Sequence, residues 1–370
     1  MDLQMLAQNI RRLRNAKHLS QKELAEKAGL SLPSIKNLEL AKGEPRMRTI
    51  QAISKVLDVK VQEFFWPVSE LRTVRFRSVK RMQNRENILA TITKKIKDFN
   101  YLEEILNYHI PFNLKKIIPQ CRRDNIIETA NLCRKKLGLK PHEPIHDICG
   151  LLEKAGVKVL FLPMSSDGFF GLSIGEKDGG PAVAVNVWER IPVERRIFSA
   201  AHEFGHIMLH PDAFDIDLKE ENKDEEAEAN LFAGHFLLPD DGFREEWNDA
   251  SGLHFVDRVF KIKRIFRVSY KAILYRLTEL NFADKSIWPR FNSAYQQKFH
   301  KSLPYTEEPM GIDSSEPYGL KAYDFFEDCF SRLVRLAIEK DKISLSRGAE
   351  MLGISLESMQ NLLKNWEVIL

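Results

Sequence analysis

The stretch His202-Glu203-Phe204-Gly205-His206 decides how this chain is interpreted. It lies in a segment, residues 197–210, whose apolar residues recur with the period of a helix. Residues four apart share one face of a helix, so both imidazoles can reach one metal ion, and Glu203 can aim at a water on that ion. This residue set is typical of a zinc peptidase. The alternative is an ordinary helix that carries two histidines by chance.

A second amphipathic segment, rich in glutamate, supplies a candidate third ligand. Glu226 falls twenty residues after His206, a separation that suits a return helix packed against the first. Asn230 lies one turn after Glu226, where it can hydrogen-bond a ligating histidine. Glu225 and Glu228 compete for the ligand role, but they point to other faces of the helix. The alternative for this acidic run is a solvated helix face.

These segments resemble the ImmA/IrrE family of metallopeptidases. The resemblance is carried by residues 195–210, by residues 226–239 and by two later motifs, at residues 266–269 and 272–277. It extends over residues 121–285. The chain departs from the family at Leu237-Leu238-Pro239, where Leu-Met-Pro is usual, and this difference affects packing and not the metal ligands.

The family resemblance implies a zincin-like domain with a defined ligand set. Carried over residue by residue, it makes His202, His206 and Glu226 the metal ligands and Glu203 the general base. Zinc (Zn2+) is the expected cofactor from the ligand type, and manganese or another divalent ion is the alternative.

The first 67 residues carry a different pattern, with five short helices expected between residues 3 and 66. Ser20 caps one helix, and Glu23 three residues later completes a capping box. Gly29 ends that helix, and Ser31 caps the next, with Pro33 in its first turn. Two helices joined by a glycine turn at this spacing predict a helix-turn-helix.

Residues 19–45 resemble the XRE, or lambda-repressor-like, family of DNA-binding domains. The resemblance implies that the helix opened by Ser31 enters the major groove. The expected DNA contacts comprise groove residues on that helix and residues that hold the DNA backbone. The groove residues are Leu32, Ser34, Lys36 and Asn37, and the backbone contacts are Gln21, Lys42 and Arg46. Ser31 opens the helix, whose N-terminus can hold a phosphate. The alternative for these polar residues is an ordinary solvated face.

Between these two regions, residues 68–120 are expected to form a basic helical linker. The cationic side chains Arg72, Arg75, Arg77, Lys80 and Arg81 fit a solvated face or an extension of the DNA-contacting surface equally well.

Beyond residue 121 the sequence predicts two helices, at 124–137 and 145–155, followed by three strands at 157–161, 168–174 and 182–186. A small antiparallel sheet beside the metal helix would align an extended substrate through its edge.

The C-terminal region, residues 286–370, combines a connection at 286–320 with a repeat of the N-terminal pattern. Residues 344–362 repeat the serine, alanine and glycine positions of residues 20–38 at a fixed offset. Leu345 stands where Gln21 would be, and Gly348 replaces Leu24. A packing or protein-contact role is therefore favoured over DNA reading.

The composition of the chain limits the classes of protein to which it can belong. The chain has 370 residues, a net charge of +4 and four cysteines without a C-x-x-C pair, which fits reduced thiols in a cytoplasmic protein. Its N-terminal segment is charged and amphipathic, and no apolar run approaches membrane-spanning length, so no membrane association is expected. The expected fold class is α+β and predominantly helical.

The sequence thus predicts a DNA-binding transcriptional regulator with zinc-dependent endopeptidase activity. A double-stranded DNA operator is the first expected partner, and a repressor- or antitoxin-like protein, which the resemblance implies, is the substrate. A homodimer is compatible with the usual symmetry of operators. The rival is a non-proteolytic regulator, or a toxin–antitoxin or phage-defence component, whose zinc domain senses or binds a partner. The intact Glu203 argues against a purely inactive enzyme, because only catalysis requires it.

Overall fold

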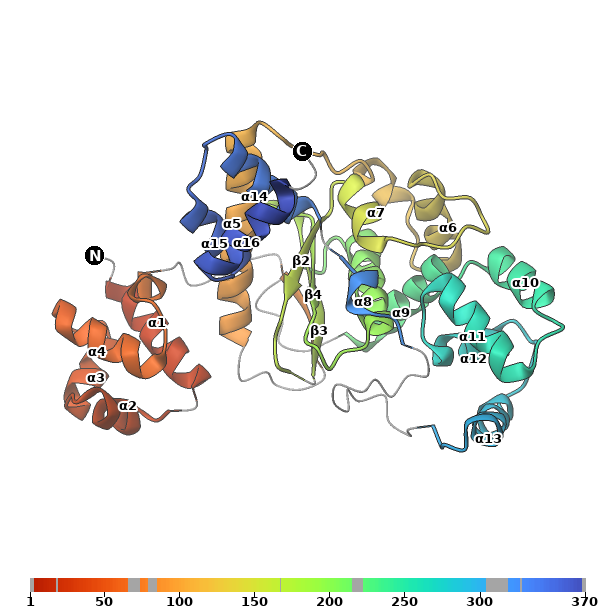
Figure 1. Cartoon of the computed structure of the whole chain (residues 1–370), viewed down its shortest axis with the longest axis horizontal. Coiled ribbons are helices and arrows are strands. Elements are labelled where there is room, and N and C mark those ends of the chain that lie inside the picture. Colours follow the sequence, from red (N-terminus) through yellow and green to blue (C-terminus); the bar gives the residue numbers. More distant parts are fainter. Residues whose placement is uncertain are drawn as a thin grey trace. The chain divides into compact units, whose positions relative to one another are not determined.

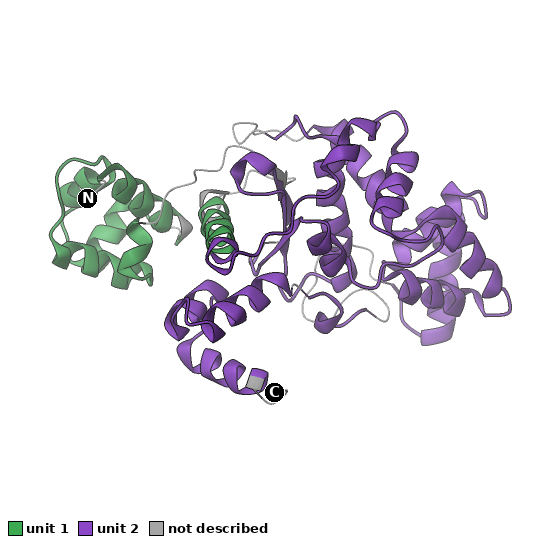
Figure 2. Cartoon of the chain, turned by 90° about the horizontal axis from the view of Figure 1, so that it is seen from above, with its two compact units in different colours: residues 1–72, 80–101 green, residues 73–79, 102–370 purple. Residues whose placement is uncertain are grey.

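The computed structural model describes most of the chain, which divides into two compact units (Figure 2). One unit comprises Met1–Arg72 with Lys80–Tyr101, and the other comprises Thr73–Val79 with Leu102–Leu370. The described residues are 3–17, 19–65, 74–78, 85–166, 168–214, 222–303, 319–326 and 328–367. Within these ranges no helix is long and apolar enough to cross a membrane.

The first unit begins with a small helical domain built around one apolar core. Its elements are α1 (Leu3–Ala16), α2 (Gln21–Ala28), α3 (Leu32–Glu39), α4 (Met47–Leu57) and the 3-10 helix η1 (Val61–Phe65). Five helices were expected, and the fifth is a 3-10 helix. Its core includes Leu6, Ile10, Leu24, Ile35, Ile50, Ile53 and Phe64.

The predicted helix-turn-helix signals produce the expected local structure. The hydroxyl of Ser20 accepts from the backbone N–H of Glu23, and the Glu23 carboxylate accepts from the backbone N–H of Ser20. Gly29 ends α2 with φ 65° and ψ 32°, a left-handed conformation that glycine adopts without strain. Ser31 caps α3, whose first turn contains Pro33. The turn between α2 and α3 is therefore fixed at both of its ends.

The second unit contains a four-stranded sheet of mixed direction. Its strands are β1 (Val74–Ser78), β2 (Lys158–Leu162), β3 (Phe169–Ile174) and β4 (Ala182–Asn186), in the order β1-β3-β4-β2. β3 pairs antiparallel with β1 and β4, whereas β2 pairs parallel with β4. The prediction of an antiparallel sheet is wrong at β2, because the β3–β4 hairpin inserts β4 between β3 and β2.

Strand β1 lies in the segment that was predicted to be a helical linker. That prediction is wrong at residues 74–78, where Val74, Arg75, Phe76 and Arg77 alternate apolar and basic residues as a strand does. The helical part of the segment is α5 (Arg85–Leu106), followed by the 3-10 helix η2 (Lys115–Gln120). Of the basic positions discussed above, Arg72, Lys80, Arg81 and the Arg77 side chain lie outside the described residues.

Two central helices connect the sheet to the rest of the second unit. Helix α8 (Val193–Leu209) packs against β3 and β4 and also against α9 (Lys223–Leu237), as Figure 1 shows. Helix α9 in turn packs against α6 (Ile126–Lys136), and α7 (Ile148–Lys154) packs against β2. Almost every side chain of α8 is therefore buried.

A helical cluster follows: α10 (Asp240–Asp249), α11 (Phe255–Phe266), α12 (Tyr270–Glu279) and α13 (Ile287–Phe299). Residues 286–320 were predicted to be a connection, and α13 corrects this for their first part. The helix forms because Ile287 and Phe291 lie one turn apart and are both buried. The Phe291 ring stacks on Tyr270 with centroids 5.3 Å apart. Residues 304–318 lie outside the described residues.

The C-terminal repeat also has the local geometry of a helix-turn-helix. It consists of α14 (Cys329–Glu339), α15 (Leu345–Leu352) and α16 (Leu356–Glu367). Ser344 caps α15, and Gly353 ends it with φ 70°. The hydroxyls of Ser355 and Ser358 are 2.8 Å apart, the same separation as in the pair Ser31 and Ser34. The repeat in the sequence is thus a repeat in backbone structure, and its role remains a prediction.

Candidate metal centre and nucleic-acid interface

Helix α8 brings the two histidines of the motif together in the interior. His202 and His206 are both fully buried, and their Nε2 atoms are 3.0 Å apart. Gly205 between them allows α9 to approach, because a Cβ at this position would lie 2.9 Å from the Phe232 ring. Close packing of the two helices is what allows a residue of α9 to reach the imidazoles.

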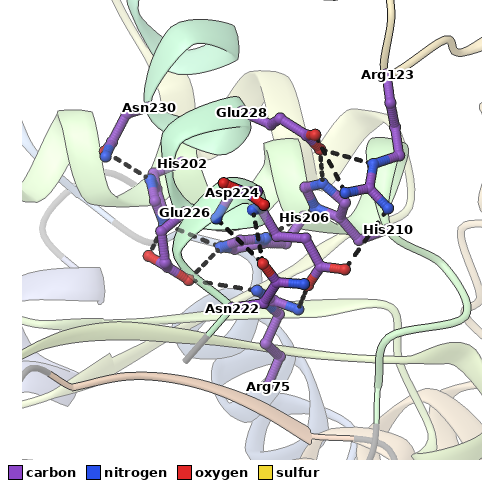
Figure 3. Close-up of polar contacts among 11 residues, drawn as sticks. Arg75, Arg123, His202, His206, His210, Asn222, Asp224, Glu226, Glu228 and Asn230 are labelled. Carbon is purple, nitrogen blue, oxygen red and sulfur yellow. Dashed lines mark hydrogen bonds and ion pairs between the residues drawn. The ribbon is translucent and has the colours of Figure 1, made fainter. Parts of the chain in front are cut away.

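Glu226 of α9 faces both imidazoles (Figure 3). Its Oε2 is 3.2 Å from Nε2 of His202, and its Oε1 is 3.1 Å from Nε2 of His206. One ligand atom from each of these three residues lies within 4.8 Å of the others. Among the described residues, the structure thus joins all three predicted ligands in one group.

Asn230 determines which nitrogen of the His202 ring carries the proton. Its Oδ1 is 3.0 Å from Nδ1 of His202. An amide oxygen only accepts hydrogen bonds, so Nδ1 carries the proton and Nε2 presents a lone pair toward Glu226. Asn230 therefore lies where it was predicted, behind a histidine of the motif.

A longer chain of contacts orients His206. Its Nδ1 is 3.0 Å from Nδ1 of His210, whose Nε2 is 2.7 Å from Oε2 of Glu228. Glu228 is bound by the Arg123 guanidinium, with Nε 2.7 Å from Oε2. Since the carboxylate accepts, His210 carries its proton on Nε2 and accepts at Nδ1, which leaves the Nε2 lone pair of His206 facing the centre.

Two imidazole lone pairs and a carboxylate therefore point at one another from about 3 Å, an arrangement that a cation stabilises. Bonds of roughly 2.0–2.1 Å to a tetrahedral zinc would set ligand atoms about 3.3 Å apart, close to the observed spacing. Burial lowers the pKa of His206 well below its usual value, which keeps this ring neutral. Burial opposes ionisation of Glu226, but the contacts with His202 and His206 lower its pKa. The residues fit a divalent metal ion.

Glu203 lies on α8 directly after His202 and is fully buried. Strand β3 confines its carboxylate, because a Cβ on Gly171 would lie 3.2 Å from Oε1 and 3.1 Å from Cγ of Glu203. A glycine in this strand therefore leaves the space that the acidic side chain occupies.

Strand β1 adds a basic residue that sequence analysis did not assign to this centre. The Arg75 guanidinium donates to Glu225, and its Nη2 is 3.5 Å from Oε1 of Glu226. Arg123 also pairs with Glu225, at 3.7 Å. Glu225 and Glu228, the two competitors for the ligand role, are thus engaged by arginines, and neither belongs to the group formed by His202, His206 and Glu226.

A cavity of about 510 Å³ adjoins this centre. Phe198, one turn before His202, and Asn230 both line it. Its wall is mainly apolar and aromatic, with Phe170, Tyr270, Tyr275 and Trp288 among the lining residues. The cavity can accommodate a large side chain next to the metal ligands.

In the helix-turn-helix domain, the predicted DNA contacts fall into two groups. Ser31, Lys36, Asn37, Lys42 and Arg46 are exposed. Gln21, Leu32 and Ser34 are partly buried, and each has a partner within the domain. Leu32 packs against the core, Ser34 contacts the Ser31 hydroxyl, and Gln21 donates to Glu39 at 2.7 Å. Ser31 is exposed, but its hydroxyl caps α3 and contacts Ser34. Lys36, Asn37, Lys42 and Arg46 are therefore the stronger candidates for contacts with DNA.

The sequence offered weak signals for the residues that support the metal centre. His210 lies one turn beyond His206, where it ends α8 and also contacts His206. Arg75 and Arg123 are far from α9 in the sequence, so no local spacing points to their contacts.

Comparison with known families identifies both regions. Residues 10–64 match the helix-turn-helix family model, and residues 152–278 match the IrrE N-terminal-like domain of the M78 peptidase family. The chain therefore contains a helix-turn-helix domain and an M78 peptidase-family domain, as both resemblances predicted.

One curated relative and two solved structures complete the comparison. The uncharacterized HTH-type transcriptional regulator YqaE of Bacillus subtilis (strain 168) is 29% identical over 102 residues, which are 28% of this chain and 84% of the relative. Bacillus thuringiensis PlcR, in complex with the peptide PapR7 and DNA, aligns over 97% of this chain and 99% of its own, at 11% identity and TM-score 0.18. ComR from Streptococcus suis aligns over 100% and 96%, at 10% identity and TM-score 0.17. These TM-scores are too low to indicate a shared fold.

Proposed function

We propose that this helix-turn-helix and M78-family chain is a DNA-binding transcription regulator with zinc-dependent endopeptidase activity. The observation that carries the proposal is the convergence of His202, His206 and Glu226 next to the buried Glu203. We further propose that the substrate is a repressor- or antitoxin-like protein, because linking both domains in one chain places the peptidase near DNA-bound proteins.

Three protein ligands would leave a coordination position of the metal open for chemistry. A zinc ion held by His202, His206 and Glu226 would polarise a peptide carbonyl and acidify a water molecule. Asn230 and His210 contribute by keeping the Nδ1 atoms of the two ligating rings occupied, so that the rings cannot turn away.

Glu203 is the proposed general base. A carboxylate one residue after a ligating histidine is placed to take a proton from the attacking water and to deliver it to the leaving amine. Gly171 and the backbone oxygen of Ala184 line the space beside it, which restricts the rotamers of Glu203. The restriction favours the geometry that proton transfer needs.

The neighbouring surfaces suit a polypeptide substrate. An extended segment can pair with a sheet edge through its main chain, and β3 is the strand that adjoins Glu203. The aromatic cavity lined by Phe198 and Tyr275 would accept one large side chain of that segment. An endopeptidase needs both features, because main-chain pairing sets the direction of the substrate and a pocket sets its register.

DNA binding is proposed for the helix-turn-helix domain, through α3. Lys36 and Asn37 are exposed on this helix, and Lys42 and Arg46 are exposed in the segment after it. Basic side chains at these positions would pair with phosphates, while Asn37 can read a base edge in the major groove.

A non-proteolytic regulator is the second candidate, and one observation favours it. His202, Glu203 and His206 are fully buried, and the β3 edge beside them is covered by β1. In that case the metal would stabilise the second unit, which would sense or bind a partner without cleaving it.

The deciding experiment compares new protein N-termini in host cells that express the wild type, Glu203→Gln or Glu189→Gln. Glu189 is exposed just before α8 and provides the matched control for the same chemical change. The zinc content of each purified protein is measured alongside. Cleavage products present with the wild type and Glu189→Gln, but absent with a zinc-loaded Glu203→Gln, would establish a peptidase and identify its target. Identical product profiles for all three zinc-loaded proteins would establish the non-proteolytic alternative.

A further inference from the structure

A segment of the chain itself lies on the sheet edge beside the metal centre. Strand β1 pairs antiparallel with β3, with Val74 opposite Ile174, Arg75 opposite Ser173 and Arg77 opposite Gly171. The other edge of β3 is already paired with β4. Residues 74–78 therefore cover the edge of β3 on which an extended peptide would pair.

This edge belongs to the candidate active site. Helix α8 packs against β3, and Gly171 of β3 is the residue whose missing side chain makes room for Glu203. Residue Arg77 of β1 lies directly opposite Gly171. A strand in the position of β1 thus runs past the proposed general base.

The Arg75 side chain extends the contact of β1 with β3 to the candidate metal ligand Glu226 and its neighbour Glu225. Its guanidinium donates to Glu225 and lies 3.5 Å from Oε1 of Glu226, the oxygen that is 3.1 Å from Nε2 of His206. The Arg75 and Glu225 side chains are only 9% and 10% exposed. A buried charge needs a buried partner, so the carboxylate of Glu225 makes this a site for a basic side chain.

We propose that residues 74–78 are a built-in substrate mimic, and that Glu225 is a specificity-determining residue that accepts a basic side chain of the substrate. Arg75 fills this subsite in the resting chain, so a substrate must displace β1 before it can pair with β3. The substrate class is then an extended protein segment with an arginine or lysine placed for Glu225. This proposal rests on the proposed peptidase function, because Glu225 can select a substrate only if the centre cleaves one. Whether β1 occupies the edge of β3 can be tested without any hydrolysis.

The position of β1 in the sequence would allow displacement of this strand to be regulated. The strand follows the helix-turn-helix domain and precedes the M78-family domain along the chain. Events that act on the segment between the two domains would therefore change access to the metal centre. A permanent structural strand is the competing explanation, and it predicts that β1 stays paired when the contact with Glu225 is lost.

The test uses the full-length chain with Glu203→Gln, so that no cleavage complicates the measurements. In this background Arg75→Glu places a third carboxylate beside Glu225 and Glu226 and should expel β1 from the edge. Arg290→Glu, an equal change at an exposed residue of α13, is the matched control. We expect amide hydrogen exchange in residues 74–78 and 169–174 to become at least about tenfold faster in Arg75→Glu only. Unchanged protection of residues 74–78 would overturn the proposal.

A binding measurement identifies what the vacated edge accepts. The probe is a fluorescent peptide with the sequence of residues 72–80, followed by fluorescence anisotropy. Since a site that is occupied in cis binds a competitor weakly, the peptide should bind Arg75→Glu at least about tenfold more tightly than the parent protein. Adding Glu225→Gln should weaken that binding at least about fivefold, whereas adding Asp224→Asn on the exposed side of the same turn should not. Equal affinity for parent and Arg75→Glu, or equal effects of the two α9 changes, would overturn it.

Arg75→Ala provides a second route if Arg75→Glu fails to fold, because it removes the contact without adding charge. Its expected exchange and binding changes have the same direction and a smaller size. Neither readout depends on hydrolysis, so these experiments can fail while the Glu203→Gln comparison in cells succeeds, and the reverse also holds.

Discussion

Nε2 of His210 lies 2.7 Å from Oε2 of Glu228, and this contact decides which nitrogen of the neighbouring His206 faces the metal centre. The carboxylate holds the proton of His210 on Nε2, so its Nδ1 accepts from His206. Arg123, just before α6, binds the same carboxylate and so connects a third helix to the centre. The support of the candidate metal site therefore extends beyond the two helices that carry its proposed ligands.

Replacing His210 tests this support. His210→Phe keeps a ring at the end of α8 but removes the acceptor for Nδ1 of His206. We expect zinc affinity to fall roughly 10–100-fold, the usual effect of losing a group that orients a ligand. Competition with a chromogenic chelator measures this affinity. His254→Phe, at an exposed histidine before α11, should leave the affinity unchanged. Equal affinities for both variants would contradict the proposed role of His210.

The space beside Glu203 leads to a second prediction. In Gly171→Ala the new methyl group would meet Cγ of Glu203 and the Ala184 oxygen at 3.1 Å, so the carboxylate must shift. We expect cleavage of the cellular target to slow on the order of 100-fold, as displaced catalytic groups do, while zinc content stays the same. Gly168→Ala, where a methyl group meets nothing within 4 Å, is the control. Full activity of Gly171→Ala would show that Glu203 is not confined in this way.

The proximity of the three candidate ligands could be predicted from the sequence because it depends on local periodicity. A four-residue spacing places His202 and His206 on one face in any helix, and Glu226 needs only a return helix. The contacts of Arg75 could not be predicted, since Glu225 lies 150 positions away in the sequence. Those contacts depend on how the chain folds back on itself.

The sheet also shows that local sequence does not predict which distant segments meet. Periodicity and residue type located β2, β3 and β4 to within a residue, because those segments are apolar and bounded by turns. Strand direction depends on which neighbour each strand meets, and the placement of β4 next to β2 reversed the expected pairing. In β1, two arginines in five residues hid an alternating pattern behind a basic composition.

A pH dependence is expected from His235 of α9. Burial opposes its protonation, but contacts with Asp240 and Glu279 raise its pKa above 6.5. A group with a raised folded-state pKa stabilises the fold fully below its unfolded pKa, and this contribution is lost as pH rises through the folded value. The wild type should therefore exceed His235→Gln in urea midpoint most clearly at about pH 6, and the difference should shrink in alkaline buffer. A difference that grows with pH would contradict the assignment.

The buried pair of Lys263 and Glu194 joins α11 to the first turn of α8, and both side chains are 1% exposed. Lys263→Met leaves the Glu194 charge in the interior, with the backbone N–H of Leu320 as a remaining donor. We expect the free energy of unfolding to fall by about 3–5 kcal/mol, the usual cost of an uncompensated buried charge. Lys263→Met with Glu194→Gln should recover part of this loss, because the charge is gone. If the double variant unfolds as easily as Lys263→Met, lost packing and not charge is the cause.

The last prediction concerns DNA binding by α3. Asn37 is exposed, whereas the Ser34 hydroxyl already contacts Ser31 at 2.8 Å, so Asn37 should make the larger contribution to base reading. Asn37→Ala should weaken binding to the native operator by about 1–3 kcal/mol, and adding Ser34→Ala should weaken it further by less. Lys42→Ala should weaken binding to every sequence and reduce the salt slope by about one. Fluorescence anisotropy with operator and scrambled DNA separates these effects, with Gln51→Ala on α4 as an exposed control. Unchanged operator affinity in the Asn37 and Ser34 double variant would remove α3 as the recognition helix.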